Sequence, residues 1–522
     1  MTSKRNQKPA LDWRKAGLGF CLAGLVTGGY AQESVEAPLE GKPAWTLTPS
    51  ISTSLTYTDN ASPGNNVGTG KGDTITNIAP GLRLQGKGGR IEGNVDFRWQ
   101  QNLYANHSDF NGDQKYLTAT GKAELVEQWL FMDVSSNIGQ SPISAFGTQT
   151  ASTQLANTNR TETRSYRWSP YIQGVLLGAA NYELRYSSAN SSAAAGVLST
   201  GSGTQTDSWN GRLSGGTPLA LLGWSLTTDN QRSQFGTLSD IRTTRTIGTL
   251  EYRIDPQVKL YANAGRESDN YSSFQYRSRT VSGFGIDWAP TERTKLSAKK
   301  DRHSYGNGYS VDFEHRTGLT AWKFTDSRGA MLPAFQMNQP QLSPAYYQLY
   351  ALASAEPDPI LRDQKVRALM TLLGIPIQTF NNNLMSYQPT VMRSQQASVT
   401  LEGANNTVTL ALQRSQNERI GTGLAVNDDF ALSSSIRQTG LTASWAHKLT
   451  PDSTLTFNAL SSRSEGNSAN QDTRLRSMSL MYTTKLGERT TANLALRQSS
   501  FDNAGGSNYD EQALTGTLTA SF

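Results

Sequence analysis

Ala513-Leu514-Thr515-Gly516-Thr517-Leu518-Thr519-Ala520-Ser521-Phe522 closes the sequence. Counting back from Phe522, every second residue is apolar or small, and a hydroxyl residue stands between each of them. This period of two predicts a β-strand with one apolar face and one polar face. At the edge of a soluble sheet such a strand would invite pairing with other chains. In a closed barrel it pairs with the first strand, and the exposed edge disappears.

The same strand resembles the last strand of bacterial outer-membrane barrels, whose end is recognised by the assembly machinery. The resemblance implies that Leu514, Leu518 and Phe522 form an assembly signal and that the barrel assembly machinery is a partner. Ala520 departs from it, since a bulky residue is preferred at that place. The alternative at this point is an ordinary terminal strand of a soluble β protein.

Residues 1–31 have the composition of a secretory signal peptide. A basic segment precedes a short apolar run from Ala16 to Thr27, and Gly29-Tyr30-Ala31 places small residues before a cut between Ala31 and Gln32. The run is too short for a spanning helix. Phe20 stands where a lipoprotein signal at Cys21 would need a small residue. We therefore expect an exported chain, with 32–44 as a short periplasmic segment and 45–522 as the barrel.

Removal of this segment changes what the composition implies. Cys21 is the only cysteine, so the mature chain of about 490 residues has no disulfide framework and no thiolate chemistry. Five basic residues against Asp12 in the leader account for +4 of the formal charge of +6. The mature chain is then close to neutral, and we infer no nucleic acid partner.

Apolar residues in the mature chain are scattered singly rather than gathered in long runs. No run of about 18 apolar residues follows residue 31, which argues against transmembrane helices. In 91–100, Ile91, Val95 and Phe97 alternate with charged and amide residues, and 182–187 and 249–255 repeat the pattern. A barrel with lipid outside and water inside requires this alternation, although a soluble sandwich shares it.

The connections separate these two folds. Long polar stretches such as 59–73, 105–114 and 140–161 take turns along the chain with tight turns such as Pro256-Gln257 and Pro451-Asp452. Transmembrane barrels have this pattern, with short periplasmic turns and long external loops. The sequence predicts an all-β, antiparallel, up-and-down transmembrane barrel of about 22 strands, within a range of 18–24. An even count places both termini in the periplasm and the barrel in the outer membrane, with membrane lipid as a partner.

One segment, 329–392, does not alternate. Pro344 begins one expected helix and Pro359 a second, which Gly374 and Pro376 end. Counting the strands that precede it places the start of this helical insert at the external end of the barrel. We expect it to enter the lumen as a plug or to cap the mouth, while packing only on itself and on nearby loops is the alternative.

Motifs for chemistry are absent from the sequence. The four histidines show no metal-ligand spacing, there is no His-Glu-x-x-His or Gly-x-Ser-x-Gly pattern, and we expect no metal, no cofactor and no enzymatic activity. Asp301 and His303 are the one pair that would suit a hydrolase at the barrel rim. A solvated loop histidine is the simpler interpretation.

The remaining candidate site is the lumen. Strand parity points charged residues of both signs inward among many Ser, Thr, Asn and Gln residues, which predicts a hydrated and weakly charge-selective wall. The predicted pore-lining residues are Arg83, Glu92, Asp96, Arg98, Lys122, Glu124, Glu183, Arg185, Glu251, Arg253, Asp312 and Arg497. Such a wall suits sugars, whose hydroxyls pair with mixed donors and acceptors. The alternative is that these side chains only form ion pairs and hydrogen bonds with one another.

Several segments are similar to one known family: 159–174 (NRTETRSYRWSPYIQG), 182–188 (YELRYSS), 288–295 (WAPTERTK) and 313–324 (FEHRTGLTAWKF). They resemble the outer-membrane β-barrel family associated with PEP-CTERM/exosortase systems, over most of the mature chain. The resemblance implies a passive conduit in exopolysaccharide export, with exopolysaccharide and export-complex proteins as partners, and no catalytic residues. A non-conducting structural or surface-anchoring barrel and, third, the rim hydrolase stay open as alternatives.

Overall fold

A computed structural model describes residues 45–63, 71–193, 203–217, 221–235, 240–270, 275–332, 343–353, 359–372, 386, 388–421 and 428–522. The predicted signal peptide, its cleavage site at Ala31 and Gln32, and the segment 32–44 lie outside these residues. Within the described residues no helix is long and apolar enough to cross a membrane.

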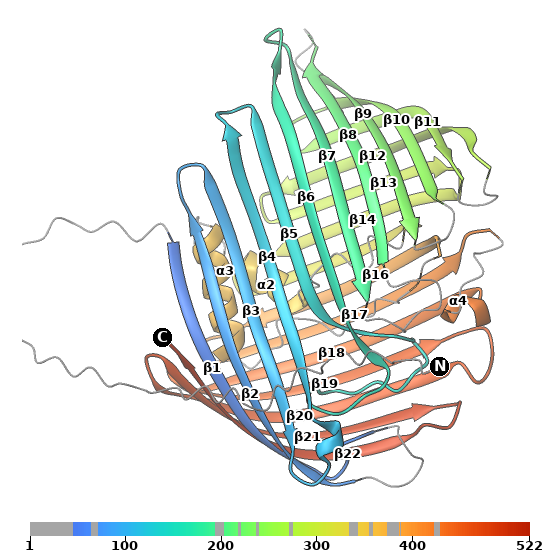
Figure 1. The fold of residues 1–522 in the computed structure, drawn as a ribbon. Coiled ribbons are helices and arrows are strands. Elements are labelled where there is room, and N and C mark those ends of the chain that lie inside the picture. The colour runs from blue at the N-terminus through green and yellow to red at the C-terminus, as the bar shows by residue number, and fades with distance from the viewer. Residues whose placement is uncertain are drawn as a thin grey trace, which may run out of the picture. The chain divides into compact units, whose positions relative to one another are not determined.

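One antiparallel sheet of 22 strands forms the described chain, and each strand pairs with the next one in sequence. Figure 1 shows this succession from the blue first strand to the red last strand. The strands are β1 Trp45–Thr58, β2 Asp73–Lys87, β3 Ile91–Tyr104, β4 Gly112–Val126, β5 Leu130–Pro142, β6 Arg160–Leu176, β7 Ala180–Ala193, β8 Gly203–Gly216, β9 Leu222–Phe235, β10 Ile241–Arg253, β11 Val258–Asp269, β12 Arg277–Thr291, β13 Thr294–His303, β14 Gly306–Arg316, β15 Thr320–Met331, β16 Thr390–Glu402, β17 Asn406–Arg419, β18 Ser435–Thr450, β19 Ser453–Glu465, β20 Asp472–Gly487, β21 Thr490–Asn503 and β22 Tyr509–Ser521.

Pairing of β22 with β1 closes the sheet into a barrel. The register runs from Ser50 opposite Ser521 to Thr58 opposite Ala513. Closure satisfies the backbone groups of the terminal strand, which would otherwise form an open edge. The predicted fold class, its strand count and the pairing of the last strand with the first are confirmed.

The two faces of the strands differ as the alternation predicts. On β22 and at the residue after it, Leu514, Leu518 and Phe522 are 42%, 50% and 64% exposed, so the predicted assembly residues all lie on the outer face. Exposed Leu, Phe, Trp and Tyr side chains recur on this face around the barrel, for example Leu250, Phe284 and Leu441. A soluble protein rarely leaves so large a continuous apolar surface uncovered. The closed sheet and this surface define a membrane-spanning barrel.

The two ends of the barrel differ in the length of their connections. At the end where β1 starts and β22 stops, named here the short-turn end, connections such as 292–293 and 451–452 are brief. At the opposite, long-loop end the connections include 143–159, 332–389 and 420–434. The turn 304–305 is the exception, since it is brief although it lies at the long-loop end.

Helices are few in the described chain. A 3₁₀ turn, η1, spans Ser108–Phe110, and α4 spans Asp429–Leu432. In the insert, α2 spans Pro344–Leu352 and α3 spans Pro359–Leu372. The insert is shorter than the predicted 329–392, because Gly329 pairs with Met392 and Met331 with Thr390 in the β15–β16 ladder. These flanking residues lack alternation in the sequence, and backbone pairing alone makes them strand.

Candidate functional site in the barrel lumen

The predicted lining residues all lie on the inward strand face, opposite to the exposed apolar residues. On β3, for example, Glu92, Asp96 and Arg98 alternate with the outward Val95 and Phe97. Register pairs the inward positions of neighbouring strands, such as Arg83 with Asp96 and Glu92 with Lys122. The structure thus places these residues around the lumen, whereas a role in conduction stays a prediction.

Many inward charges meet an opposite charge on a neighbouring position. Arg83 Nη2 lies 3.0 Å from Asp96 Oδ2, and Lys87 Nζ lies 3.4 Å from Glu92 Oε2. Further inward ion pairs join Arg245 with Asp229, Lys259 with Glu251, Lys299 with Asp301, and Arg253 with Glu251. Most of these side chains are about a third to a half exposed, while Asp301 is 11% and Lys87 69% exposed, so the exposed pairs contribute little stability, ~0–1 kcal/mol. The pairs keep the wall polar without a strong net charge.

One cluster brings three of the predicted residues, Lys122, Glu183 and Arg185, together with two aromatic rings. The rings of Phe131 and Tyr171 stack with centroids 5.1 Å apart. Lys122 Nζ lies 5.5 Å from the centroid of Phe131, and the guanidinium of Arg185 lies 3.7 Å from that of Tyr171. Cations over aromatic faces are held by the ring quadrupole. Arg185 also donates to Asp133 at 2.6 Å and to Glu183 at 3.0 Å.

A cavity of about 620 Å³ adjoins this cluster at the short-turn end. Glu124, Glu183 and Arg212 line it together with Phe131 and amide side chains. Carboxylates, a guanidinium and amides at one concave surface offer both donors and acceptors. This arrangement can hold a polyhydroxylated solute by hydrogen bonds.

The connection 143–159 between β5 and β6, named here the constriction loop, bends into the lumen. Gln154 Nε2 donates to Ser54 Oγ at 2.9 Å, and its Oε1 accepts from Thr56 Oγ1 at 2.7 Å. Both partners are inward residues of β1. Leu155 is 2% exposed and packs with the inward Ile75 and Tyr104 of β2 and β3. The sequence predicted a long external connection here and missed its inward course.

Bonds from the constriction loop reach strands far along the chain. Tyr509 of β22 donates its hydroxyl to Gln149 O at 2.7 Å. Asn503 of β21 donates to Phe146 O at 3.2 Å, and Thr473 of β20 donates to Ala145 O at 3.3 Å. The loop therefore bridges β5–β6 and β20–β22 at the long-loop end.

Asp429 anchors the beginning of the constriction loop. Its carboxylate accepts from Ser144 Oγ and from Ala145 N, both at 2.7 Å. Burial raises the pKa of Asp429, although both donors act in the opposite direction. Burial likewise raises the pKa of the neighbouring Asp428, which accepts from Ser386 Oγ at 2.8 Å. Desolvation disfavours the charged carboxylates, so this anchor depends on protonation.

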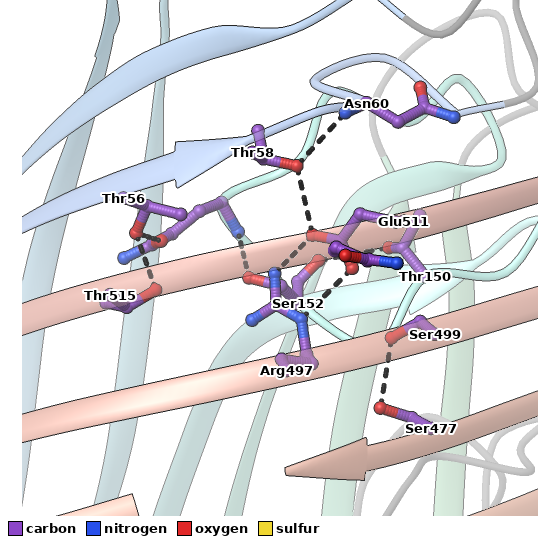
Figure 2. Close-up of polar contacts among 12 residues, drawn as sticks. Thr56, Thr58, Asn60, Thr150, Ser152, Ser477, Arg497, Ser499, Glu511 and Thr515 are labelled. Carbon is purple, nitrogen blue, oxygen red and sulfur yellow. Dashed lines mark hydrogen bonds and ion pairs between the residues drawn. The ribbon is translucent and has the colours of Figure 1, made fainter. Parts of the chain in front are cut away.

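Glu511 forms a buried ion pair with Arg497, drawn in Figure 2. Its fully buried carboxylate accepts two bonds from Arg497, at 2.6 and 3.1 Å, and one from Thr58 Oγ1 at 3.3 Å. The three residues belong to β22, β21 and β1. A bidentate pair of this kind is strong and directional, and here it lies at the closing seam of the barrel. The alternation of the sequence predicted that Arg497 faces the lumen, but it did not predict the ion pair with Glu511.

The helices α2 and α3 pack against inward residues of β15–β18. α2 contacts β15, β16 and β17, and Leu349 packs with Met370 of α3 and Ala446 of β18. Gln348 Nε2 donates to Ser398 Oγ at 2.5 Å, and its Oε1 accepts from Thr400 Oγ1. Thr400 lies two residues from the end of β16, so α2 lies near the short-turn end.

The two intruding elements cover the inner wall unevenly. Inward residues near them are fully buried, as Thr56, Thr400 and Glu511 show at 0% exposed. Near the short-turn end, inward side chains of β10 and β11 stay open, with Arg253 at 51% and Lys259 at 40% exposed, whereas Ile241 and Glu267 towards the long-loop end are buried. Lys122 on β4 and Arg277 and Arg279 on β12 are also exposed inward residues. These exposed polar side chains, which alternate with buried ones such as Ser165 and Thr206, form the accessible polar wall along β4–β13.

The predicted hydrolase pair does not form. Asp301 is bound by Lys299 and accepts from Asn263 at 2.8 Å, while His303 Nδ1 lies 3.2 Å from Glu267 Oε2. The ring of His303 also stacks on that of Tyr305, with centroids 5.0 Å apart. Among the residues that the structure describes, no group of His, Cys, Asp and Glu is arranged to hold a metal ion.

These features define a membrane-spanning β-barrel of outer-membrane type with a polar lumen that one loop and one helical insert enter. The family described as a protein of unknown function, DUF481, matches residues 193–312, which is less than half of the chain. No curated protein matches the sequence.

Solved structures to which this chain is similar include two receptors and an iron transporter. A ferric enterobactin receptor (PfeA) mutant from Pseudomonas aeruginosa is 10% identical with a TM-score of 0.45, covering 91% of this chain and 80% of that one. The siderophore receptor PirA from Acinetobacter baumannii is 6% identical with a TM-score of 0.47, covering 91% and 80%. The FrpB iron transporter from Neisseria meningitidis is 11% identical with a TM-score of 0.45, covering 90% and 81%. The barrel of this chain follows from its own strand pairing, independently of these similarities.

Proposed function

We propose that the barrel is a passive conduit for polar solutes, with a polysaccharide as the cargo that its wall fits best. The observation that supports it is the accessible polar wall along β4–β13, which remains beside the constriction loop and the insert. Its inward charges are paired in both signs, as in Asp229 with Arg245 and Glu251 with Lys259. Such a wall binds hydroxyl groups without holding ions tightly.

The proposed setting is the outer membrane, with both termini and the short turns in the periplasm. The reason is the asymmetry of the connections, because long loops face outward in barrels of this kind. We further propose an association with exopolysaccharide export through a PEP-CTERM/exosortase system. It rests on the segment similarity described above and on the wall chemistry.

Conductance tests the conduit directly. The purified barrel in a planar bilayer should pass ions, and the paired change Arg253→Glu and Arg279→Glu should move the reversal potential in a salt gradient towards cation selectivity. The control Lys300→Glu and Arg302→Glu reverses two outward charges of β13 and should leave the reversal potential unchanged. A parent barrel without conductance would refute the conduit.

The cargo needs a test in the cell. Deletion of the gene should reduce secreted polysaccharide, and the parent gene should restore it. The Arg253→Glu and Arg279→Glu variant should restore it only in part. Unchanged secretion in the deletion strain would exclude polysaccharide as the cargo. Other polar solutes would then remain as candidates.

A second candidate is a structural or surface-anchoring barrel that conducts nothing. The burial of inward residues around Thr56 and Thr400 favours it, since two elements fill much of the lumen there. An assembled barrel that stays closed in the bilayer, together with a surface defect in the deletion strain, would support this function.

A further inference from the structure

The outward face of β17–β20 carries arginines near the long-loop end. Register places Arg463 of β19 opposite Arg474 of β20, and Arg414 of β17 opposite Thr439 of β18. Arg476 follows two positions along β20, opposite Ser461. A cavity of about 300 Å³ opens among these side chains, lined by Thr439, Leu441, Ser461, Arg463, Glu465, Arg474 and Arg476. We name it the arginine groove.

Acidic residues compensate only part of this charge. Arg463 binds Asp472 through two bonds of 2.9 and 2.6 Å and Glu465 at 3.1 Å. Asp502 lies opposite Arg474 in the β20–β21 register. No described residue forms an ion pair with Arg414, Arg474 or Arg476 within 4.0 Å. Three guanidinium groups with free donors therefore remain on the outer surface.

A second cavity, of about 500 Å³, lies on the same outer wall over β19–β22 and β1. Its lining includes Phe457, Met478, Leu480, Leu496 and Leu514, and we name it the apolar groove. On β20, Met478 and Leu480 follow Arg474 and Arg476 at successive outward positions, in steps of about 6.6 Å. Met478 is 60% exposed and Leu496 56% exposed. A cationic groove thus adjoins an apolar one on a surface that faces lipid.

We propose that the two grooves together bind a phosphorylated, multiply acylated lipid of the surrounding leaflet. Arginine recognises phosphate through paired N–H donors, and an outward cation at the membrane surface attracts anionic headgroups. The acyl chains fill the apolar groove, where they pack against Met478, Leu480 and Leu496 by dispersion contacts. The arginines lie nearer the long-loop end than Met478 and Leu480. This order matches one lipid whose phosphate is outermost and whose acyl chains point towards the membrane centre. This site is independent of whether the barrel conducts.

Lipid binding to the purified full-length barrel tests the site. In detergent micelles containing bisphosphorylated lipid A, native mass spectrometry should show a retained lipid on the parent. The variant Arg414→Gln, Arg474→Gln, Arg476→Gln should bind it roughly 100-fold more weakly, at about fivefold for each arginine. Phosphatidylethanolamine should not be retained, and inorganic phosphate should not displace lipid A, because it cannot occupy the apolar groove.

The matched control is Arg266→Gln, Lys300→Gln, Arg302→Gln, which removes three outward charges from β11 and β13. It should bind like the parent. Equal loss in both triple variants, or no loss in the first, would overturn the proposal, as would full displacement by inorganic phosphate. If the first variant does not fold, Met478→Ala with Leu496→Ala in the apolar groove gives the second measurement and should weaken retention. Unchanged retention by that variant would equally overturn it.

Discussion

The backbone N–H of Phe522 donates to the carbonyl oxygen of Pro49 across 2.9 Å. This bond extends the β1–β22 ladder past Ser521, so the last residue is held by the first strand. The side chain of Phe522 stays 64% exposed on the lipid-facing side. Closure of the barrel and presentation of the aromatic ring therefore occur at the same residue.

The first prediction concerns this ring. Phe522→Asp places a charge on the lipid-facing side and removes the aromatic end, so the yield of folded barrel in the membrane should fall several-fold. Ser521→Asp is the control, because Ser521 lies on the inward face and its variant should assemble like the parent. Heat-modifiable gel mobility of membrane fractions measures both, and equal assembly of the two variants would contradict the prediction.

The second prediction concerns the buried pair at the seam. Glu511→Ala leaves the largely buried Arg497 without its carboxylate, and the free energy of unfolding should fall by about 3 kcal/mol. The double variant Arg497→Met, Glu511→Leu removes both charges and should lie within about 1 kcal/mol of the parent. Urea unfolding in lipid vesicles measures both. A single variant as stable as the parent would show that the pair contributes nothing.

The third prediction is a pH dependence of the constriction loop. The pKa of Asp429 is raised above its ordinary value of 3.8 by burial. A raised folded-state pKa means that docking is most stable below the ordinary value and weakens as pH rises through the raised pKa. Hydrogen exchange of 143–159, corrected for intrinsic rates, should therefore show protection falling from about pH 4 towards neutral.

Asp429→Asn separates this effect from other titrations. The amide oxygen can still accept from Ser144 and Ala145, but the side chain no longer titrates. Asp428 faces the same region with its own raised pKa, so Asp428→Asn is measured in parallel. A pH profile that persists in the double variant would place the sensitivity elsewhere.

The fourth prediction concerns the insert. Joining Met331 to Thr390 by a short Gly/Ser linker removes it without shortening β15 or β16, and single-channel current should rise while the barrel still folds. The ladder hydrogen bonds of the sheet close without it, which is the reason for expecting folding. An unchanged current through a folded barrel would show that the insert does not occlude the lumen.

A point variant sharpens this test. Gln348→Ala removes the side chain that joins α2 to Ser398 and Thr400. Thr400 keeps its bond to Thr409, but the buried Ser398 hydroxyl loses its partner, which costs about 1–3 kcal/mol and should produce frequent open events in the bilayer. The exposed Tyr347 provides the control, since Tyr347→Ala changes the same helix without touching the wall.

The sequence alone determined the architecture. Alternation places Leu514, Leu518 and Phe522 on one face, and the parity of connections predicts an even strand count. Inward positions such as Glu92 and Arg185 follow from the same counting. These predictions succeed because the strand period is a local property, and a barrel in lipid repeats one rule on every strand.

Only the tertiary structure decided what enters the lumen. Ser144 and Asp429 are 285 residues apart, and Thr58 and Glu511 are 453 residues apart, yet each pair is hydrogen-bonded. The course of the loop 143–159 depends on such partners, and no local pattern in its Ser, Thr and Asn residues specifies them. The physical reason is that a polar loop satisfies its backbone equally well with water outside or with wall groups inside. Closure of the sheet brings those wall groups within reach, and that happens only in the folded barrel.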